Sequence, residues 1–307
     1  MKTKIVVGSR GSKLALIQAE SVVARLREKN HDIEVSISKI VSGGDRDRRT
    51  PLDSMEGIGI FVKELEEALL DGNIDLAVHS LKDMPTEIPG ELRLAAVMER
   101  TDPGDVLVSR SGSLAELAPA AKIGTCSLRR TVQLNAIRPD LEVRSIRGNI
   151  DTRLEKVSRG EYDGVILAAA ALIRLGWKDK ISEYLPMEHF LPAAGQGALA
   201  IETRLNDEEI TGFISSLNHL PTWQSITAER TLLRALGGGC RTPIAALGTV
   251  IGSTLQLKGM AADSDGKKIL YASEEGSVES PEEIGIRLAQ KLLAMGAADY
   301  ITEVNDR

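Results

Sequence analysis

The chain has 307 residues, of which 42% are hydrophobic and 27% charged, and its formal net charge is −6. This composition is typical of a globular protein with room for two or three domains. The negative charge and an aromatic content of 3% argue against nucleic-acid binding. The apolar run from Ile5 to Val7 is too short for a signal peptide, and no stretch could span a bilayer, so we expect a cytoplasmic protein.

The first part of the chain alternates strand-like and helix-like segments. Apolar runs predict strands at 4–8, 33–41, 73–80 and 91–98. Helical spacing predicts a helix from Ser12 and another over 59–72. From Thr101 a second set follows, with strands in 101–109, 122–125 and 141–146, helices from Ser127 and Asn149, and a strand running into a helix over 162–176. Alternation of this kind predicts mostly parallel sheets with helices on both faces.

The pattern changes after Pro221. A helix over 222–236 leads to a glycine-rich loop, three strand-like runs and a last helix from Pro281 to Met295. The expected fold class is therefore α/β, with two doubly wound domains and a small C-terminal α+β domain. We expect domain 1 at 1–98 and 199–217, domain 2 at 103–193, and domain 3 at 220–307.

Three strand-to-helix corners share one chemistry. Each joins small or hydroxyl residues, which expose N–H groups at a helix N-terminus, to arginine, whose fork matches a carboxylate. The corners are "GSRGSKLAL", "IGTCSLRR" and "RGNIDTRL", with Ser12 and Asn149 as expected N-caps. One such corner is usually only a cap, but three at strand ends predict a cleft for a ligand with several carboxylates or phosphates.

Two further stretches carry candidate chemistry. Lys82 and Asp83 follow the predicted strand "DLAVHS", which makes Asp83 either a general acid/base and counter-ion or an ordinary loop aspartate. Cys240 follows three consecutive glycines. The only other cysteine is Cys126, with no Cys-x-x-Cys or His-x-x-x-His pair, so we expect no metal, although acidic residues alone could hold a labile ion.

Eight stretches, in order and over nearly the whole chain, resemble the porphobilinogen deaminase (hydroxymethylbilane synthase) family. They are "GSRGSKLAL", "GIFVKELE", "DLAVHSLKDMPT", "IGTCSLRR", "RGNIDTRL", "ILAAAALIRLG", "PAAGQGALAIE" and "LGGGCRTPI". The resemblance implies two domains like those of type II periplasmic binding proteins and a third that carries a cysteine loop. It also implies a dipyrromethane cofactor held by a thioether to that cysteine, here Cys240. A thiolate suits this task because it is a soft nucleophile.

The implied reaction is a stepwise condensation of four porphobilinogen molecules. Each loses ammonia to give an azafulvene, which the free α-carbon of the terminal pyrrole attacks, and water finally releases hydroxymethylbilane. Each ring brings an acetate and a propionate, which accounts for the arginines of an acidic protein. The resemblance further implies a monomer, no nucleic-acid or membrane partner, and uroporphyrinogen-III synthase as the downstream enzyme.

The resemblance also implies a role for particular side chains. Asp83 would stabilise the cationic pyrrole nitrogens and move protons, with Lys82 beside it. Phe61 would lie near a substrate ring, unless it is plain core. The carboxylates of cofactor and substrate would be bound by Arg10, Ser12, Thr125, Ser127, Arg129, Arg130, Arg147, Arg153, Arg174 and Gln196.

The chain departs from the family pattern in places. The active-site loop of the family commonly reads Gly-Gly-Lys-Gly, whereas this chain has Glu56 and Ile58 at two of those positions, and Ser54 where a lysine is common. Arg46, Arg48 and Arg49 lie just upstream. Cys126 stands where serine is usual, as a small buried residue or a thiol of low pKa at a helix start.

Two rival functions fit part of the sequence. An anion-binding module related to periplasmic binding proteins fits the corners, but it has no use for the Gly-Gly-Gly-Cys loop. A thiol-dependent transferase would use Cys240 catalytically, but it needs a base, and the nearest histidine in sequence is His219.

Overall fold

The computed structural model describes residues 4–30, 33–41, 62–239 and 242–300. Phe61, Cys240 and the loop positions from Arg46 to Ile58 lie outside the described residues. The chain divides into two compact units, which we describe separately. The first combines 1–101 with 198–223, and the second combines 102–197 with 224–307. The division into three domains stays a prediction, because the second unit contains both a five-stranded and a three-stranded sheet.

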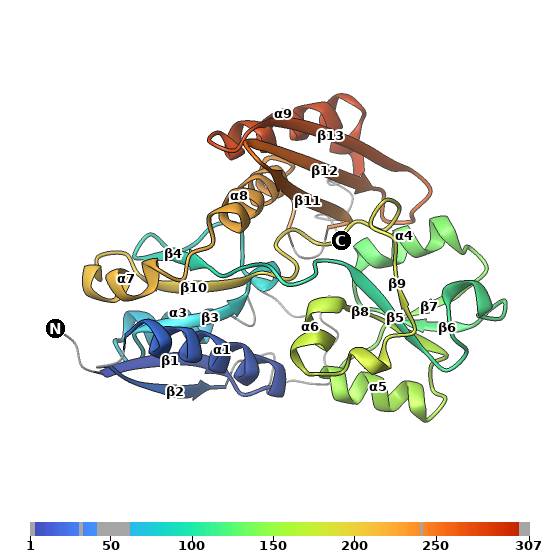
Figure 1. Cartoon of the computed structure of the whole chain (residues 1–307). Coiled ribbons are helices and arrows are strands. Elements are labelled where there is room, and N and C mark those ends of the chain that lie inside the picture. The colour runs from blue at the N-terminus through green and yellow to red at the C-terminus, as the bar shows by residue number, and fades with distance from the viewer. Residues whose placement is uncertain (1–3, 31–32, 42–61, 240–241, 301–307) are drawn as a thin grey trace. The chain divides into compact units, whose positions relative to one another are not determined.

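The first unit is built on a five-stranded sheet of order β2-β1-β3-β10-β4 (Figure 1). Its strands are β1 (Lys4–Arg10), β2 (Glu34–Ile40), β3 (Leu76–Ser80), β4 (Leu92–Val97) and β10 (Leu199–Arg204). Strand β1 is parallel to β2 and β3, whereas β10 is antiparallel to both of its neighbours. Only β10 therefore runs against the other four strands.

Helices cover both faces of this sheet, because alternate residues of a strand point to opposite faces. Its helices are α1 (Lys13–Lys29), α3 (Lys63–Leu70) and α7 (Glu208–Ser215). On β3, Leu76 and Val78 share a core with α1 and α7. Ala77, between them, shares a second core with α3. Strand β3 is buried on both faces, which explains its continuous apolar sequence.

The second unit repeats this plan in a sheet of order β7-β6-β8-β5-β9. Its strands are β5 (Asp105–Ser109), β6 (Lys122–Gly124), β7 (Glu142–Arg144), β8 (Gly164–Ala168) and β9 (Glu183–Tyr184). Its helices are α4 (Leu128–Ile137), α5 (Ile150–Ser158) and α6 (Ala169–Arg174). The reversed strand is β5, which is antiparallel to β8 and β9. Residue Ile166 of β8 faces α4, and its neighbours face α5 and α6.

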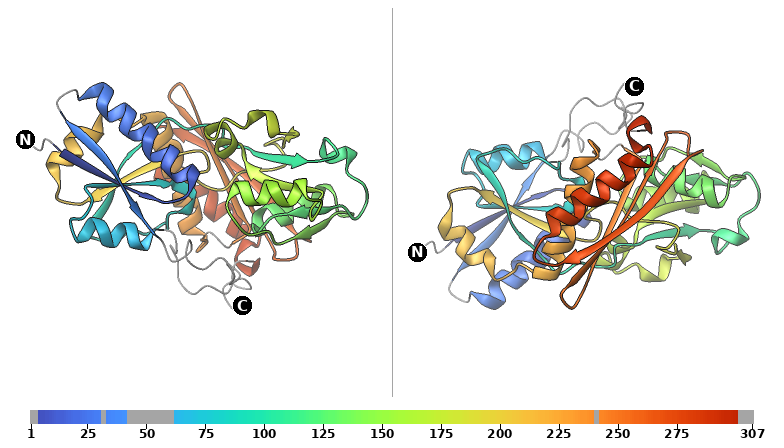
Figure 2. Two further views of the ribbon diagram at one scale, coloured as in Figure 1. Left: turned by 90° about the horizontal axis from the view of Figure 1, so that it is seen from below. Right: turned by 90° about the horizontal axis from the view of Figure 1, so that it is seen from above.

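The second unit also holds a three-stranded antiparallel sheet of order β11-β12-β13. It comprises β11 (Ile244–Ile251), β12 (Thr254–Ala262) and β13 (Ile269–Ser277). Helix α9 (Pro281–Ala294) lies across it, and α8 (Leu220–Ala235) packs into the same core (Figure 2). Met260 of the sheet packs with Val132 of α4 and with Leu191. Through these contacts the sheet is joined to α4.

The expected fold class, α/β with a small C-terminal α+β part, is confirmed. Strands β9 and β10 and helix α7 were not expected from the sequence, and neither was the reversal of one strand in each large sheet. Three short 3-10 turns, Leu81–Asp83, Leu114–Glu116 and Lys178–Lys180, complete the regular structure of the described residues. No helix in the described ranges has the length and apolar character needed to cross a membrane.

Candidate active site

In the first unit, the corner after β1 holds Arg10 and Ser12. Ser12 is the N-cap of α1, as expected, and its side chain accepts a hydrogen bond from the Ala15 N–H at 3.3 Å. Behind it the buried Ser9 hydroxyl lies 3.0 Å from the Ala15 carbonyl oxygen. These contacts fix how the helix leaves the strand, and they set the position of Arg10 at the strand end.

Lys82 and Asp83 occupy the 3-10 turn that follows β3, and both side chains are half-buried. The turn is held by the Leu81 N–H, which donates to the Ala198 carbonyl at 3.1 Å. Since β1 and β3 are parallel neighbours, their carboxyl ends meet at one edge of the sheet. The structure therefore brings the Arg10 corner and the Asp83 turn to the same sheet edge, where open α/β sheets bind ligands.

A hydrogen bond between the buried Gln18 and the half-buried Ser80 ties these two segments together. The Gln18 amide nitrogen lies 3.0 Å from the Ser80 hydroxyl, at the end of β3. Gln18 stands on α1, which starts at the Arg10 corner, and it is buried. A buried polar contact is retained only when both partners are satisfied, so it holds α1 and the Asp83 turn in one arrangement.

In the second unit, the corner after β6 contains Thr125, Cys126 and Ser127. Ser127 is at the N-cap position of α4, but its side chain does not cap the helix. Its N–H instead donates to the hydroxyl of the buried Thr125 at 3.1 Å. Cys126 is half-buried rather than fully buried, and its thiol donates to the Ile146 carbonyl at 2.7 Å. The thiol thus joins this corner to the segment that follows β7.

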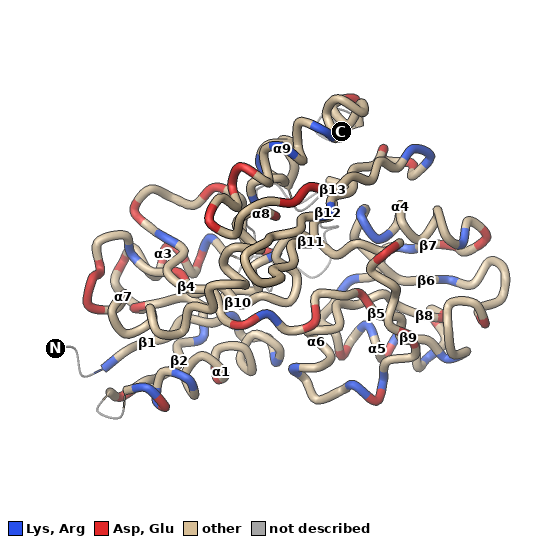
Figure 3. Tube along the Cα trace, turned by 45° about the horizontal axis from the view of Figure 1, so that its top comes forward, with Lys and Arg blue, Asp and Glu red and all other residues tan. Residues whose placement is uncertain are grey.

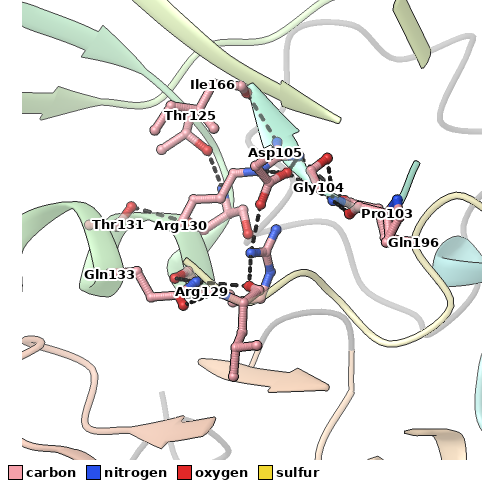
Figure 4. Close-up of polar contacts among 12 residues, drawn as sticks. Pro103, Gly104, Asp105, Thr125, Arg129, Arg130, Thr131, Gln133, Ile166 and Gln196 are labelled. Atoms are coloured by element: carbon pink, nitrogen blue, oxygen red, sulfur yellow. Dashed lines mark hydrogen bonds and ion pairs between the residues drawn. The ribbon is translucent and has the colours of Figure 1, made fainter. Parts of the chain in front are cut away.

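Arg129 and Arg130, in the first turn of α4, point at one buried carboxylate (Figure 4). Asp105, the first residue of β5, is fully buried, and both arginines are more than nine-tenths buried. Arg129 Nη1 lies 2.8 Å from Asp105 Oδ2. Arg130 Nη2 and Nε lie 2.6 Å and 3.1 Å from Oδ1. One carboxylate oxygen therefore accepts hydrogen bonds from Arg130, and the other forms an ion pair with Arg129.

Gln196 joins these three side chains. We call the group of Asp105, Arg129, Arg130 and Gln196 the Asp105 cluster. The Gln196 amide nitrogen donates to Asp105 Oδ1 at 2.9 Å and to the Pro103 carbonyl at 2.7 Å. Arg130 Nη1 donates to the Ile166 carbonyl at 3.1 Å, and Arg129 Nη1 to a carbonyl in the segment after β9 at 2.6 Å. Within the described residues, Nη1 is the only nitrogen of the Arg129 guanidinium that forms an ion pair or a hydrogen bond.

The Asp105 cluster carries one more positive than negative charge, since two guanidinium groups face one carboxylate. Burial alone would raise the pKa of Asp105, but Arg129 and Arg130 hold that pKa well below its ordinary value. Burial also lowers the pKa of Arg129, an effect that the attraction of Asp105 only offsets in part. A buried site with surplus positive charge favours a further anion.

The remaining predicted arginines of the second unit lie near strand and helix ends. Arg147 precedes Gly148, whose φ of +106° favours glycine, and a side chain there would meet Thr152 at 2.8 Å. Arg153 Nε donates to the Gly148 carbonyl at 2.8 Å. On α6, Arg174 donates to the Gly197 carbonyl at 2.7 Å, and burial lowers its pKa to about 10. Arg153 thus braces the backbone at the corner before α5, and Arg174 braces the segment before β10.

The contacts of the Asp105 cluster predict how the stability of the fold depends on Asp105. Asp105→Asn is expected to destabilise the fold by about 3–5 kcal/mol, because it leaves two buried guanidinium groups facing a neutral amide. Since the folded-state pKa of Asp105 is lowered, its contribution is complete above the ordinary pKa of 3.8 and is lost as the pH falls below it. Urea unfolding at neutral and acidic pH measures both effects. The variant should lack the part of the stability loss at acidic pH that comes from protonation of Asp105.

The control is Glu142→Gln, which removes an exposed carboxylate 2.6 Å from Arg144. Exposed pairs contribute only about 0–1 kcal/mol, so this variant should unfold close to the wild-type urea concentration. Equal unfolding midpoints for both variants would contradict a structural role for the Asp105 cluster.

Asp105 belongs to the candidate site, although no pattern in the sequence pointed to it. It stands in "TDPGDVLVS", a stretch that predicts a turn and a strand. The signal available was an aspartate at the first position of an otherwise apolar strand. Such a carboxylate needs a buried cation, and the chain offers two consecutive arginines at a helix start.

Arginines, hydroxyls and helix starts lie at the carboxyl ends of strands in this α/β protein, an arrangement that suits anions. Two family models match it: "Porphobilinogen deaminase, dipyromethane cofactor binding domain" over residues 5–212 and "Porphobilinogen deaminase, C-terminal domain" over 223–294. The chain is 48% identical to a porphobilinogen deaminase of Geotalea uraniireducens over 98% of its length and 95% of the relative's. A porphobilinogen deaminase of Geobacter sulfurreducens is 47% identical, with the same coverage. The chain belongs to the porphobilinogen deaminase family.

Solved structures of lower similarity were also found. The methionine-binding protein MetQ matches with a TM-score of 0.44 and 13% identity, over 73% of this chain and 91% of that one. The periplasmic aliphatic sulphonate binding protein SsuA from Escherichia coli matches with a TM-score of 0.40 and 15% identity, over 76% and 71% of the two chains.

Proposed function

We propose that this chain condenses four porphobilinogen molecules into hydroxymethylbilane with release of ammonia, as a transferase of tetrapyrrole and heme biosynthesis. The observation that supports this most strongly is the match of both family models, which together span 5–212 and 223–294. The Lys82-Asp83 turn, at the same sheet edge as Arg10 and Ser12, is consistent with it. The alternative, a binding module without turnover, would give no function to the Lys82-Asp83 turn or to the Cys240 loop.

The Asp105 cluster fits a dipyrromethane cofactor, whose two rings carry four carboxylates. Its surplus positive charge is buried, and Arg129 uses only Nη1 among the described residues, so the rest of its fork suits a second carboxylate. Arg130 makes four hydrogen bonds, to Asp105, Gln196 and the Ile166 carbonyl, and is the more structural of the two. We assign the thioether to Cys240. When bound, the cofactor supplies the pyrrole α-carbon to which the first unit is added.

The two units have different tasks in this proposal. In the first, Asp83 stabilises positive charge on the pyrrole nitrogen and moves a proton, while Lys82, Arg10 and Ser12 bind carboxylates of the substrate. In the second, further carboxylates are bound by Thr125, Ser127, Arg147, Arg153, Arg174 and Gln196. The cleft that would unite these side chains stays a prediction, as does the place of Phe61 beside a ring.

The direct test is to incubate the purified chain with porphobilinogen and to measure ammonia, hydroxymethylbilane and the intact mass of the protein. We expect ammonia and hydroxymethylbilane to form, and the protein mass to exceed that of the sequence by two linked pyrrole units. Binding of porphobilinogen without ammonia release or added mass would instead support the anion-binding module.

The arginines are expected to act at different stages of chain growth. Arg129→Leu should impair cofactor assembly, because it removes the guanidinium with donors left for a cofactor carboxylate. Arg10→Leu and Arg147→Leu should give holoenzyme that stalls with substrate attached. Each charge-assisted bidentate pair is worth roughly 1.5–3 kcal/mol, so the loss of one should be visible in mass spectra after incubation with porphobilinogen.

Equal and mild defects in all three arginine variants would contradict this staged role. The arginines would then act as a general electrostatic attraction for a polyanion, and the defects should shrink as salt is added, because salt screens exposed charges. Measuring the variants at low and high ionic strength separates the two outcomes.

We also propose that the chain works as a monomer in the cytoplasm. Its linear product would pass to a ring-closing enzyme, uroporphyrinogen-III synthase, because hydroxymethylbilane has a reactive end that must be consumed. Sedimentation of the purified protein tests the monomer.

A further inference from the structure

Glu229 is a buried carboxylate in the second unit that the proposed reaction does not use. It lies on α8 and has no exposed surface. One of its oxygens accepts a hydrogen bond from the Gly195 N–H at 2.7 Å, and the other accepts one from the Gly248 N–H at 2.7 Å. A single side chain thus joins α8, the segment before β10 and strand β11.

The first of these contacts leads to the Asp105 cluster. Gly195 is bonded directly to Gln196, whose amide nitrogen lies 2.9 Å from Asp105 Oδ1 and 2.7 Å from the Pro103 carbonyl. Asp105 in turn holds Arg129 and Arg130. The position of the Gly195 backbone therefore sets that of the amide that completes the cluster.

The second contact depends on a close approach of β11 to α8. A side-chain carbon at Gly248 would lie 2.9 Å from the Ser225 carbonyl oxygen and 3.0 Å from its Cα, so only glycine fits without moving the backbone. This approach brings the Gly248 N–H within reach of Glu229. Helix α8 ends at Ala235, and the chain then runs through Gly237 to the residue before Cys240.

We propose that Glu229 is a positioning residue for cofactor attachment, an inference that rests on the proposed function. It fixes the helix that leads to Cys240 relative to the Asp105 cluster, where the carboxylates of the cofactor would bind. A carboxylate serves this purpose better than an amide, because both of its oxygens accept N–H bonds, whereas an amide would turn an NH₂ group toward one of the two donors. Glu229 acts through the backbone and touches no substrate.

The test uses Glu229→Gln, which keeps the size of the side chain and removes one acceptor. Protein produced without porphobilinogen is mixed with it, and the gain of the two-pyrrole mass is followed over time. We expect the variant to load roughly 10- to 100-fold more slowly than wild type, because small displacements of reacting groups cost rate of this order. Variant that has finished loading should then turn over at a rate near that of wild type, which a general loss of structure would not allow.

The matched control is Asp75→Asn in the first unit. Asp75 is also buried and accepts a main-chain N–H, that of Val6, at 2.7 Å, and it precedes β3 at the end opposite to Asp83. This variant should lose stability and load at the wild-type rate. Equal slowing in both variants, or wild-type loading by Glu229→Gln, would overturn the proposal.

A second variant keeps the proposal testable if Glu229→Gln fails to fold. Gly248→Ala leaves the carboxylate in place and forces β11 away from Ser225, so it should reproduce the slow loading. Wild-type loading by this variant would contradict the proposal. Wild-type protein is the reference throughout. If wild type gains no pyrrole mass, the proposed function fails. If wild type loads and both variants load at the same rate, only the role of Glu229 fails.

Discussion

Replacing Cys240 with serine is expected to give a folded chain that carries no dipyrromethane and makes no hydroxymethylbilane. A serine hydroxyl is a far weaker nucleophile than a thiolate at neutral pH, so the bond to the cofactor should not form. The expected loss of activity is complete, because each product molecule is built on the attached primer. Intact mass and the formation of hydroxymethylbilane are the two measurements.

The matched control is Cys126→Ser, since Cys126 is the only other cysteine. Its thiol donates to the Ile146 carbonyl, a bond that a hydroxyl can also make, so this variant should keep the cofactor mass and the activity. A normal cofactor mass on Cys240→Ser together with its loss on Cys126→Ser would move the anchor to the corner before α4.

The second large effect is expected for Asp83→Asn. The substitution nearly keeps the shape of the side chain and removes its charge. Cofactor should still be attached, but turnover should fall by about 10²-fold or more, which is the usual cost of losing a preorganised charge that stabilises a transition state. Steady-state formation of hydroxymethylbilane, normalised to the holoenzyme fraction from intact mass, measures the effect.

Glu87→Gln is the control for Asp83, because it removes an exposed carboxylate from the loop that follows the same turn. Its turnover should stay near that of wild type. If Asp83→Asn also stayed within a few-fold of wild type, the aspartate would be an ordinary loop residue, and the source of proton transfer would have to be sought elsewhere.

The regular elements were predictable because hydrophobic spacing reports local structure. The strands and helices expected from the sequence agree with β1, β3 and α1 and with the C-terminal sheet. Helix α7 was missed, although Asp207 caps it by accepting the Ile210 N–H at 3.2 Å. The reversal of β5 and β10 was not predictable from such patterns, because strand direction depends on pairing between residues far apart in the chain.

The site was predictable in its residue types and not in its internal contacts. The arginine corners were visible because arginine, glycine and hydroxyl residues recur after strands. The partner of Arg129 and Arg130 was not visible, because Asp105 is about 25 positions away and only the tertiary fold brings it to α4. Glu229 escaped notice for the same reason, since an acid within a helix usually faces solvent.

The order of strands in the first unit has a consequence for the synthesis of the chain on the ribosome. Strand β10 lies between β3 and β4, yet it is made more than a hundred residues after β4 begins. Until residues 199–204 leave the ribosome, the edges of β3 and β4 that will pair with β10 have unpaired backbone groups, with which other chains could pair. The first unit therefore cannot complete its sheet when residues 1–101 have been made, and it must wait until all five strands of the second sheet, β5 to β9, have been translated.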